Sequence, residues 1–582
     1  MALLTLVRPS FYQDSVALLA LARELRARPD VAEAAALMAT PANRELLAQA
    51  GLLTAEAAAA GPNDLVIVID AAPTAAVPAR ARAEELLSAR RARREHGGRH
   101  APRTIDGALR RMPDADLALI SVPGVWAATE ARRALARGLH VMIWSDNVSI
   151  EDEVALKQLA ARSGLLVLGP DCGTAYLGGI PLGFANLVPR GRVGMVAASG
   201  TGLQQVAALL AAQGEGISQA IGVGSRDMSL AVGGLMTLAA LDALGADAGT
   251  EIIAVIGKPG APAVRRAIET KLRAIGKPAV VALLGADIRT GTTHGITTVA
   301  TLEDTCGAIV AGSRWSPRAF SLSPEDVRRQ VEAARRGLPP GGTAIRGLYA
   351  GGTLAHEAAL ILEPWLGPID TNMAPRPQPL ASSRSRHQIV DLGADEHTVS
   401  RAHPMLDPTL RLEAIAAAAR DDDVGVLLLD VVLGLGAATD PAGDLAPALE
   451  AARGRGRALA IVLSVIGTAA DPQGLAGQIA RLERAGAWVL PSNAQAARAA
   501  ACIAGPDRVM NALLTETPRD RAGRDLQARA ARDQCRARGL RRRSRAARRA
   551  RDPRGLGAAR GCGSREGGAT RRARRRARTG GQ

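Results

Sequence analysis

Two glycine-rich segments carry the residue types that bind an oxyanion, and the first lies at residues 193–204. It reads Val-Gly-Met-Val-Ala-Ala-Ser-Gly-Thr-Gly-Leu-Gln, which predicts a buried strand, a tight turn and a helix. The unpaired N–H groups and the positive dipole end of such a helix attract an anion. We therefore predict a phosphate site at Ser199, Gly200, Thr201 and Gly202. No Gly-Lys-Ser/Thr follows, so this is not a Walker motif. An ordinary Ser/Thr cap on a crossover helix is the alternative.

The second segment, at residues 348–357, repeats the pattern as Leu-Tyr-Ala-Gly-Gly-Thr-Leu-Ala-His-Glu. Here the predicted phosphate-binding residues are Gly351, Gly352 and Thr353. One such turn is weak evidence, because many helices begin after small residues. Two turns that each open an α/β domain of similar size can point two helix starts at one shared anion. We therefore expect both starts to lie within bonding reach of a single phosphate group.

Three charged residues follow predicted strands and are candidates for catalysis. Asp227 comes shortly after a Gly-Val-Gly turn, and its neighbour Arg226 is suited to pair with a carboxylate or phosphate. Asp430 ends one apolar strand, and Lys258 closes another, where it could neutralise a substrate carboxylate. Ligands in α/β sheets bind at the carboxyl ends of the strands. The competing interpretation is that the aspartates only cap helices, and a single Gly-x-Gly carries little weight.

Residues 387–407 hold three of the eight histidines, among several acidic residues. The histidines are ten and then six residues apart, a spacing that fits no compact ligand set, so we predict no metal site. We expect a substrate-binding loop that includes His403 and Asp407. A contact between domains and a merely solvated loop are the alternatives.

The five cysteines are odd in number and show no Cys-x-x-Cys spacing, which favours neither a disulfide framework nor a zinc site. No apolar run approaches the roughly 18 residues that a membrane span needs, and the first residues lack the features of a signal peptide. We therefore expect a cytoplasmic protein that does not associate with membranes.

The elements that must position the candidate residues alternate between strand and helix. Residues 1–80 are predicted to form a small α+β module, and the Arg-rich residues 81–112 a linker. Strand and helix then alternate as in βαβ units with a parallel sheet. The predicted fold class is α/β, with three consecutive α/β layers at residues 113–188, 189–336 and 343–510. Because aromatic residues make up only 2% of the chain, Ala, Val, Leu and Ile must fill the cores.

The net charge of +17 is concentrated in residues 519–582. This tail has 23 Arg, no Lys and five acidic residues, a net charge of +18, which leaves −1 for residues 1–518. The tail is predicted to bind nucleic acid only non-specifically, through counterion release. Its Arg-, Ala- and Gly-rich composition is typical of out-of-frame translation of GC-rich DNA, and sequencing the gene across codons 505–530 tests that hypothesis. A disordered tail is the alternative.

Taken together, the motifs resemble the FdrA family, whose members are relatives of succinyl-CoA synthetase. The resemblance runs in one order over roughly residues 3–510. It rests on Leu-Gly-Pro-Asp-Cys-Gly-Thr at 168–174, His-Pro-Met-Leu-Asp-Pro at 403–408, both glycine-rich turns, and residues 216–227 and 429–434. It implies a Rossmann-like CoA-binding-type domain at 113–188, followed by two flavodoxin-like succinyl-CoA-ligase-like domains at 189–336 and 343–510. It also implies that Val122, Pro123 and Gly124 belong to a CoA-binding turn, and CoA is the one cofactor it suggests.

The chain departs from the synthetase in ways that affect the expected activity. It has no ATP-grasp domain before the last layer and no Gly-His-Ala-Gly phosphohistidine loop, and the nearest substitute, His294 in Thr-Thr-His-Gly, has the wrong flanks. The resemblance implies one subunit of a hetero-oligomeric carbamoyltransferase of purine and allantoin breakdown. This enzyme interconverts oxalurate plus phosphate with oxamate plus carbamoyl phosphate, so its ligand is carbamoyl phosphate or another acyl phosphate. The alternatives are an acyl-CoA ligase that acts with an ATP-binding partner, a non-catalytic scaffold, and a nucleic-acid-binding protein.

Overall fold

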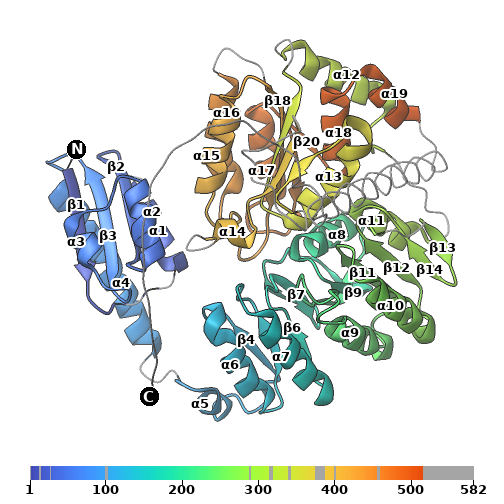
Figure 1. Ribbon diagram of the computed structural model, residues 1–582, viewed down its shortest axis with the longest axis horizontal. Coiled ribbons are helices and arrows are strands. Elements are labelled where there is room, and N and C mark those ends of the chain that lie inside the picture. The colour runs from blue at the N-terminus through green and yellow to red at the C-terminus, as the bar shows by residue number, and fades with distance from the viewer. Residues whose placement is uncertain are drawn as a thin grey trace, which may run out of the picture. The chain divides into compact units, whose positions relative to one another are not determined.

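The computed structural model describes residues 2–11, 13, 15–26, 28–98, 102–286, 290–312, 319–338, 342–373, 387–398, 402–454 and 459–515 (Figure 1). Within these residues the strands form four sheets, one antiparallel, two wholly parallel and one mixed. This confirms the predicted α/β class. No described helix is both long and apolar enough to cross a membrane. The Arg-rich tail lies outside the described residues.

Residues 2–98 form the small α+β module. Its antiparallel sheet has the order β1-β3-β2, from β1 (Ala2–Arg8), β2 (Val31–Met38) and β3 (Leu65–Ala71). Alternate residues of β3 pack against α1 (Ser15–Arg26) and α4 (Ala76–Gly98) on one face, and against α2 (Pro41–Gln49) and α3 (Ala55–Ala59) on the other. Residues 81–98 were expected to be a linker, but they are helical, because Ala83 and Leu87 complete this core.

A three-stranded parallel sheet forms the Rossmann-like domain. Its order is β4-β5-β6, from β4 (Leu117–Ile120), β5 (His140–Ile143) and β6 (Val167–Leu168). The connections are α6 (Gly124–Leu135) and α7 (Ile150–Arg162), after a short α5 (Ile105–Leu109). The buried side of α6 consists of alanines with one leucine, which lets the helix pack closely on the sheet.

The next sheet has eight strands in the order β13-β14-β12-β11-β9-β10-β7-β8. Its parallel centre is β9 (Arg190–Ala197), β10 (Ile217–Gly222), β11 (Ile252–Gly257), β12 (Ala279–Leu283) and β14 (Ile296–Thr298). The antiparallel edges are β13 (Gly291–Thr293) on one side and β7 (Thr174–Leu177) with β8 (Ile180–Gly183) on the other. Its helices are α8 (Gly200–Ala212), α9 (Leu235–Ala246), α10 (Pro262–Ile275) and α11 (Leu302–Ala311).

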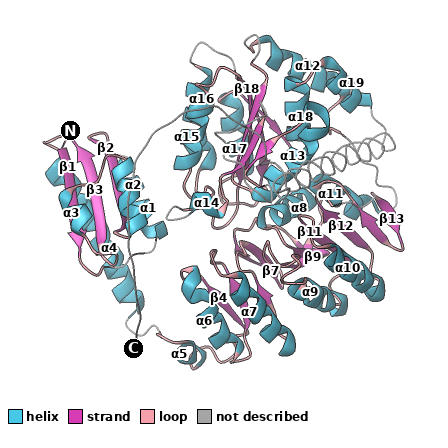
Figure 2. Ribbon diagram, in the orientation of Figure 1, coloured by secondary structure: helices cyan, strands magenta, loops and turns pink. Residues whose placement is uncertain are grey.

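The last sheet has six parallel strands in the order β16-β17-β15-β18-β19-β20. They are β15 (Ala344–Tyr349), β16 (Asp370–Thr371), β17 (Gln388–Asp391), β18 (Val424–Val432), β19 (Ala460–Ile466) and β20 (Ala487–Leu490). Every residue of β18 is buried, as in a parallel strand with both faces covered. Figure 2 shows α15 (Thr409–Ala418) and α16 (Pro441–Arg453) on one side of β18, and α13 (Gly352–Leu366) and α18 (Asn493–Ala504) on the other.

Two domain boundaries differ from the sequence-based expectation. The hairpin β7–β8 was placed in the domain at 113–188, but it pairs with β10 in the eight-stranded sheet. The helix α12 (Pro324–Arg336) was placed in the domain at 189–336, but it packs on α18. Arg335 on α12 holds the two helices together, because it donates hydrogen bonds to Ile503 O near the end of α18 and to the carbonyl of Gly505, the C-cap of that helix.

Glu357 on α13 joins three helices in the core and makes stability depend on pH. It accepts hydrogen bonds from Leu302 N at 2.7 Å and from Asn493 Nδ2 at 2.8 Å. Burial raises the pKa of this carboxyl from 4.5 to about 7, against the opposing effects of Asn493, Leu302 and Arg498. The folded state thus keeps a proton that the unfolded state has lost, and stability falls as the pH rises between these two values.

We therefore predict a pH-dependent difference between the wild-type chain and Glu357→Gln. The glutamine cannot ionise, so the free energy of unfolding of the wild type should fall relative to the variant as the pH rises from about 4.5 to 7, by at most about 3 kcal/mol. Urea unfolding at several pH values measures this difference. A difference that stays constant across the range would contradict the assignment.

Candidate functional site

The first predicted helix start, that of α8, lies at the carboxyl end of β9. Ser199 is the N-cap, and its Oγ accepts a hydrogen bond from Gly202 N at 2.9 Å. The alternative reading as a cap is therefore correct for Ser199 itself. It does not compete with anion binding, since in the described part of the chain no acceptor bonds the N–H groups of Gly200 and Thr201. These two donors are available to a ligand.

The second start, that of α13, follows β15 and is held by a buried carboxylate. Asp430 accepts hydrogen bonds from Ala350 N and Gly351 N, each at 2.9 Å, and from Arg411 Nη2 at 2.7 Å. It is fully buried, so neither oxygen is left for a substrate. The predicted catalytic role of Asp430 therefore lacks support, and we assign it the positioning of this glycine turn. Among the described residues no acceptor bonds the N–H groups of Gly352 and Thr353.

The two helix starts touch. Ser199 Oγ donates a hydrogen bond to Thr353 Oγ1 at 2.7 Å. A Cβ built on Gly351 would lie only 2.8 Å from Thr201 Oγ1 and 2.9 Å from Thr201 Cβ. Glycine is thus required at Gly351 so that the second turn can approach the first. The contact places the two helix starts, each with free N–H groups, next to each other.

Asp391, at the end of β17, lies in front of α13. A Cβ built on Gly352 would be 2.3 Å from Asp391 Oδ2, while Oδ1 accepts a hydrogen bond from Gly393 N at 3.0 Å. Burial raises the pKa of the Asp391 carboxyl to about 6, and the charge of Lys258 opposes that rise. The same cation, second to burial, helps to lower the pKa of His356 to about 4. The charge of Lys258 therefore acts on both Asp391 and His356, which supports its predicted place in the site.

The predicted substrate loop reaches the neighbourhood of Asp391 through His403. His403 Nδ1 accepts a hydrogen bond from Met405 N at 3.2 Å, and burial lowers the pKa of the ring to about 4. Its other nitrogen is 2.6 Å from a Cβ built on Gly393, beside Asp391. Asp407 instead accepts hydrogen bonds from both the N–H and the hydroxyl of Thr409. Asp407 therefore fixes the start of α15, and its Oδ1 is already occupied by these two hydrogen bonds.

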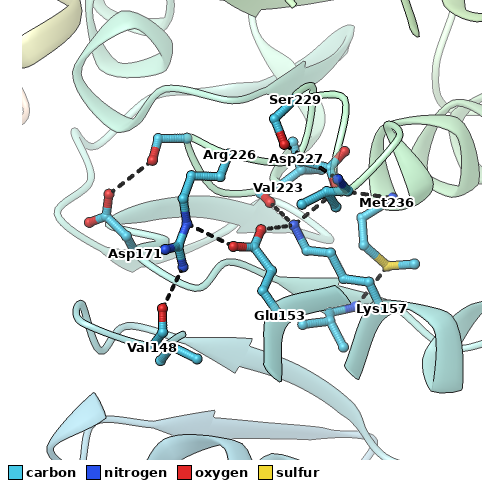
Figure 3. A network of polar contacts seen from close by, with 12 residues as sticks. Val148, Glu153, Lys157, Asp171, Val223, Arg226, Asp227, Ser229 and Met236 are labelled. Carbon is cyan, nitrogen blue, oxygen red and sulfur yellow. Dashed lines mark hydrogen bonds and ion pairs between the residues drawn. The ribbon is translucent and has the colours of Figure 1, made fainter. Parts of the chain in front are cut away.

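Asp227 belongs to a closed network, shown in Figure 3. It is fully buried and accepts hydrogen bonds from Lys157 Nζ at 2.9 Å, from Thr237 N at 2.9 Å and from Thr237 Oγ1 at 2.6 Å. Lys157 also bonds Glu153 Oε1 at 2.7 Å, and Arg226 Nε pairs with Glu153 Oε2 at 2.8 Å. The Asp227 carboxylate and the Lys157 ammonium group therefore both have internal partners. The geometry argues against substrate contact by Asp227 and assigns it to joining α7 with the loop before α9.

The predicted CoA turn lies at the carboxyl end of β4. Pro123 is the N-cap of α6, and Gly124 packs so tightly that an added Cβ would be 2.2 Å from Asp146 O. Three apolar side chains around it are open to solvent: Val122 is 37% exposed, Val125 76% and Trp126 66%. The turn thus offers a close backbone approach and an apolar surface at a helix start.

Other sequence-based candidates lie elsewhere or have no counterpart. His294 is exposed in the turn between β13 and β14, at the amino end of β14, whereas α8 begins at the opposite, carboxyl edge of the sheet. The described residues contain no group of three or more His, Cys, Asp or Glu side chains arranged to hold a metal ion. Cys172, Cys306 and Cys502 are buried free thiols.

The sequence missed two residues that matter to the site. Asp391 ends a parallel strand at the carboxyl edge, the same signal that drew attention to Asp430, but it was considered only as part of the histidine-rich stretch. Arg411, which pairs with Asp430, lies in the first turn of α15 and gave no signal.

Comparison with known proteins was made for both sequence and structure. A family model described as CoA-ligase matches residues 348–503, and one described as the heavy metal-associated domain of AllF matches residues 1–103. The uncharacterized protein YahF of Escherichia coli (strain K12) is 38% identical over 502 residues, which cover 85% of this chain and 97% of YahF.

More distant likenesses cover less. The α subunit of ADP-forming succinate–CoA ligase from Methanothermobacter thermautotrophicus is 27% identical over 188 residues, 31% of this chain and 61% of that subunit. Among solved structures, the dinucleotide-forming acetyl-coenzyme A synthetase 1 of Ca. Korarchaeum cryptofilum is 17% identical. That match covers 69% of this chain and 84% of the synthetase, with a TM-score of 0.29, too low to support an argument.

Proposed function

Because the chain belongs to the FdrA family, a group of succinyl-CoA-ligase-like proteins, we propose that it is the phosphate-binding subunit of a carbamoyltransferase. The reaction would transfer a carbamoyl group between an amide nitrogen and phosphate, so that oxalurate and phosphate are interconverted with oxamate and carbamoyl phosphate. The match of residues 1–103 to a domain named after AllF supports a place in allantoin breakdown. The other subunits would be separate proteins of a cytoplasmic hetero-oligomer.

The observation that carries this proposal is the contact between the starts of α8 and α13, where Ser199 Oγ bonds Thr353 Oγ1 at 2.7 Å. Two helix starts with free N–H groups stabilise the phosphate of an acyl phosphate as a leaving group and as a nucleophile. Lys258 adds a positive charge near Asp391 and His356, beside the start of α13. The chemistry needs no phosphohistidine, which agrees with the absence of that loop from the sequence.

In the forward direction an oxygen of the bound phosphate would attack the carbamoyl carbon of an acylurea. A new C–O bond forms, the C–N bond breaks, and the nitrogen that leaves takes up a proton to become a primary amide. The N–H groups of Gly200, Thr201, Gly352 and Thr353 would hold the phosphate in place during the attack. In reverse, the same groups would stabilise the phosphate that carbamoyl phosphate releases.

The second candidate function is an acyl-CoA ligase that acts with an ATP-binding partner. The exposed Val122, Val125 and Trp126 around Gly124 favour it, since they fit the binding of a nucleotide-bearing cofactor such as CoA. In that case Pro123 and Gly124 would lie against the cofactor, which would supply a thiol. A non-catalytic scaffold would retain these surfaces without either reaction.

Calorimetric titration of the chain with carbamoyl phosphate and, separately, with CoA tests these functions. We expect binding of carbamoyl phosphate in which the hydroxyls of Thr201 and Thr353 donate hydrogen bonds beside the backbone N–H groups. Thr201→Val and Thr353→Val each remove one such charge-assisted donor, so each should weaken the binding about 10- to 150-fold. A second experiment assays the chain, co-purified with the products of neighbouring genes, for carbamoyl transfer and for ATP-dependent CoA thioester. Thioester formation by the chain alone, or unchanged affinity in both variants, would contradict the proposal.

A further inference from the structure

Asp391 is the carboxylate of the candidate site that keeps an oxygen free of the protein. Its side chain is buried, and Oδ1 is held by Gly393 N at 3.0 Å. Oδ2 is 2.3 Å from a Cβ built on Gly352, so it occupies the space in front of the α13 start. In the part of the chain that the structure describes, no donor bonds Oδ2. Asp430, by contrast, has both oxygens bonded.

An oxyanion at the start of α13 would meet this carboxylate. Two negative charges within a few ångströms repel strongly in a buried site. The phosphate can bind there only if Asp391 moves away or becomes neutral. Its position leaves little room for movement, because β17 holds its backbone between β15 and β16 and Gly393 N holds Oδ1.

The charged groups around Asp391 come from several elements. Asp430 and Asp395 favour its neutral form, while Lys258 favours the carboxylate. Asp171, in the loop after β6, also interacts electrostatically with Asp391. Desolvation, and then the charges of Asp395 and Asp146, raise the pKa of Asp171, but the exposure of Asp171 to solvent weakens these effects. His403 is the remaining neighbour, and its lowered pKa keeps it neutral above about pH 5.

We propose that the site binds a divalent oxyanion together with one proton, and that Asp391 holds this proton on Oδ2. The inference rests on the proposed function, because it places the phosphate at the α13 start. It also supplies a missing step of the transfer. The neutral Asp391 would donate its proton to the nitrogen as the C–N bond breaks, and the attacking hydrogen phosphate would then return its own proton to the carboxylate, so that no proton is gained or lost.

Sulfate is the probe that tests this proposal, since it stays a dianion at every pH used, whereas phosphate titrates near neutrality. The full-length chain is titrated calorimetrically with sulfate at pH 6 and pH 8. Because the Asp391 pKa is about 6, uptake of one proton on binding predicts an affinity about fiftyfold lower at pH 8 than at pH 6. In Asp391→Asn the affinity should change less than about threefold, and at pH 8 it should exceed that of the wild type.

Two variants serve as controls. Asp395→Asn removes a nearby but exposed carboxylate, and Asp171→Asn removes the other neighbour with a raised pKa, so both should keep most of the pH dependence. Equal pH dependence in Asp391→Asn and the wild type would overturn the inference and leave the anion site standing. Loss of the dependence in Asp171→Asn instead would move the proton to that residue. Absence of sulfate and phosphate binding in every protein would overturn the site and the proposed function with it.

Discussion

Replacement of Lys157 by methionine is expected to lower the free energy of unfolding of the first cooperative transition by about 3–5 kcal/mol. The ammonium group is fully buried between Glu153, at 2.7 Å, and Asp227, at 2.9 Å, and it also bonds Val223 O at 2.8 Å. Methionine fills a similar volume but leaves two buried carboxylates without their shared cation. The cost arises from these stranded charges, because a complete buried ion pair by itself adds little to stability.

The matched control for this change is Lys271→Met. Lys271 pairs with Asp242 at 2.7 Å, but both side chains are partly exposed, and such surface pairs contribute about 0–1 kcal/mol. Urea unfolding of the two variants measures the difference. If both variants unfold at the same urea concentration, the network in Figure 3 does not join α7 to the loop before α9 in the way we describe.

The second large effect is expected for Gly352→Val, which should weaken phosphate binding at least tenfold while the protein remains folded. A Cβ at this position would be 2.3 Å from Asp391 Oδ2 and 3.1 Å from its Cγ. The added side chain must therefore push the carboxylate aside and fill the space where the anion would lie. The effect at Gly200 should be milder, since a Cβ there would lie 3.3 Å from Thr174 Oγ1 and 3.9 Å from Gly173 Cα.

Gly477→Val is the control for the glycine change. Gly477 lies within α17 (Leu475–Arg484), and a Cβ built on it meets nothing within 4 Å. Calorimetry should show unchanged phosphate affinity in this variant. Equal losses in both variants would mean that phosphate binding responds to a general loss of stability and not to the start of α13.

The sequence predicted the elements whose signal is local. The apolar run of β18 and the small-residue turns before α8 and α13 are signals from neighbouring residues. The structure has both turns where they were expected, whereas β18 continues to Val432, so Asp430 lies within the strand and not at its end. Because strand-turn-helix units are repeated, the sequence also led us to predict that both turns face one shared anion, and the structure brings the two turns into contact. The resemblance to a known family extended this to the order of the domains.

What the sequence could not predict depends on partners that are distant along the chain. Lys157 and Asp227 are 70 residues apart, and Asp430 is 80 residues from the N–H group of Ala350 that it bonds. A charge at the end of a strand has the same local signature whether it meets a substrate or a buried cation. We therefore assign Asp227 and Asp430, which were predicted to be catalytic, to holding other parts of the protein in place. Asp391, which has one oxygen free, is assigned to the site instead.

A crystal structure of the chain with bound phosphate or carbamoyl phosphate tests the central claim most directly. We predict one phosphate group whose oxygens lie about 2.7–3.2 Å from N–H groups of both helix starts, Gly200 or Thr201 on α8 and Gly352 or Thr353 on α13. A phosphate bound at only one of the two helices, or at another place on the chain, would contradict the shared site.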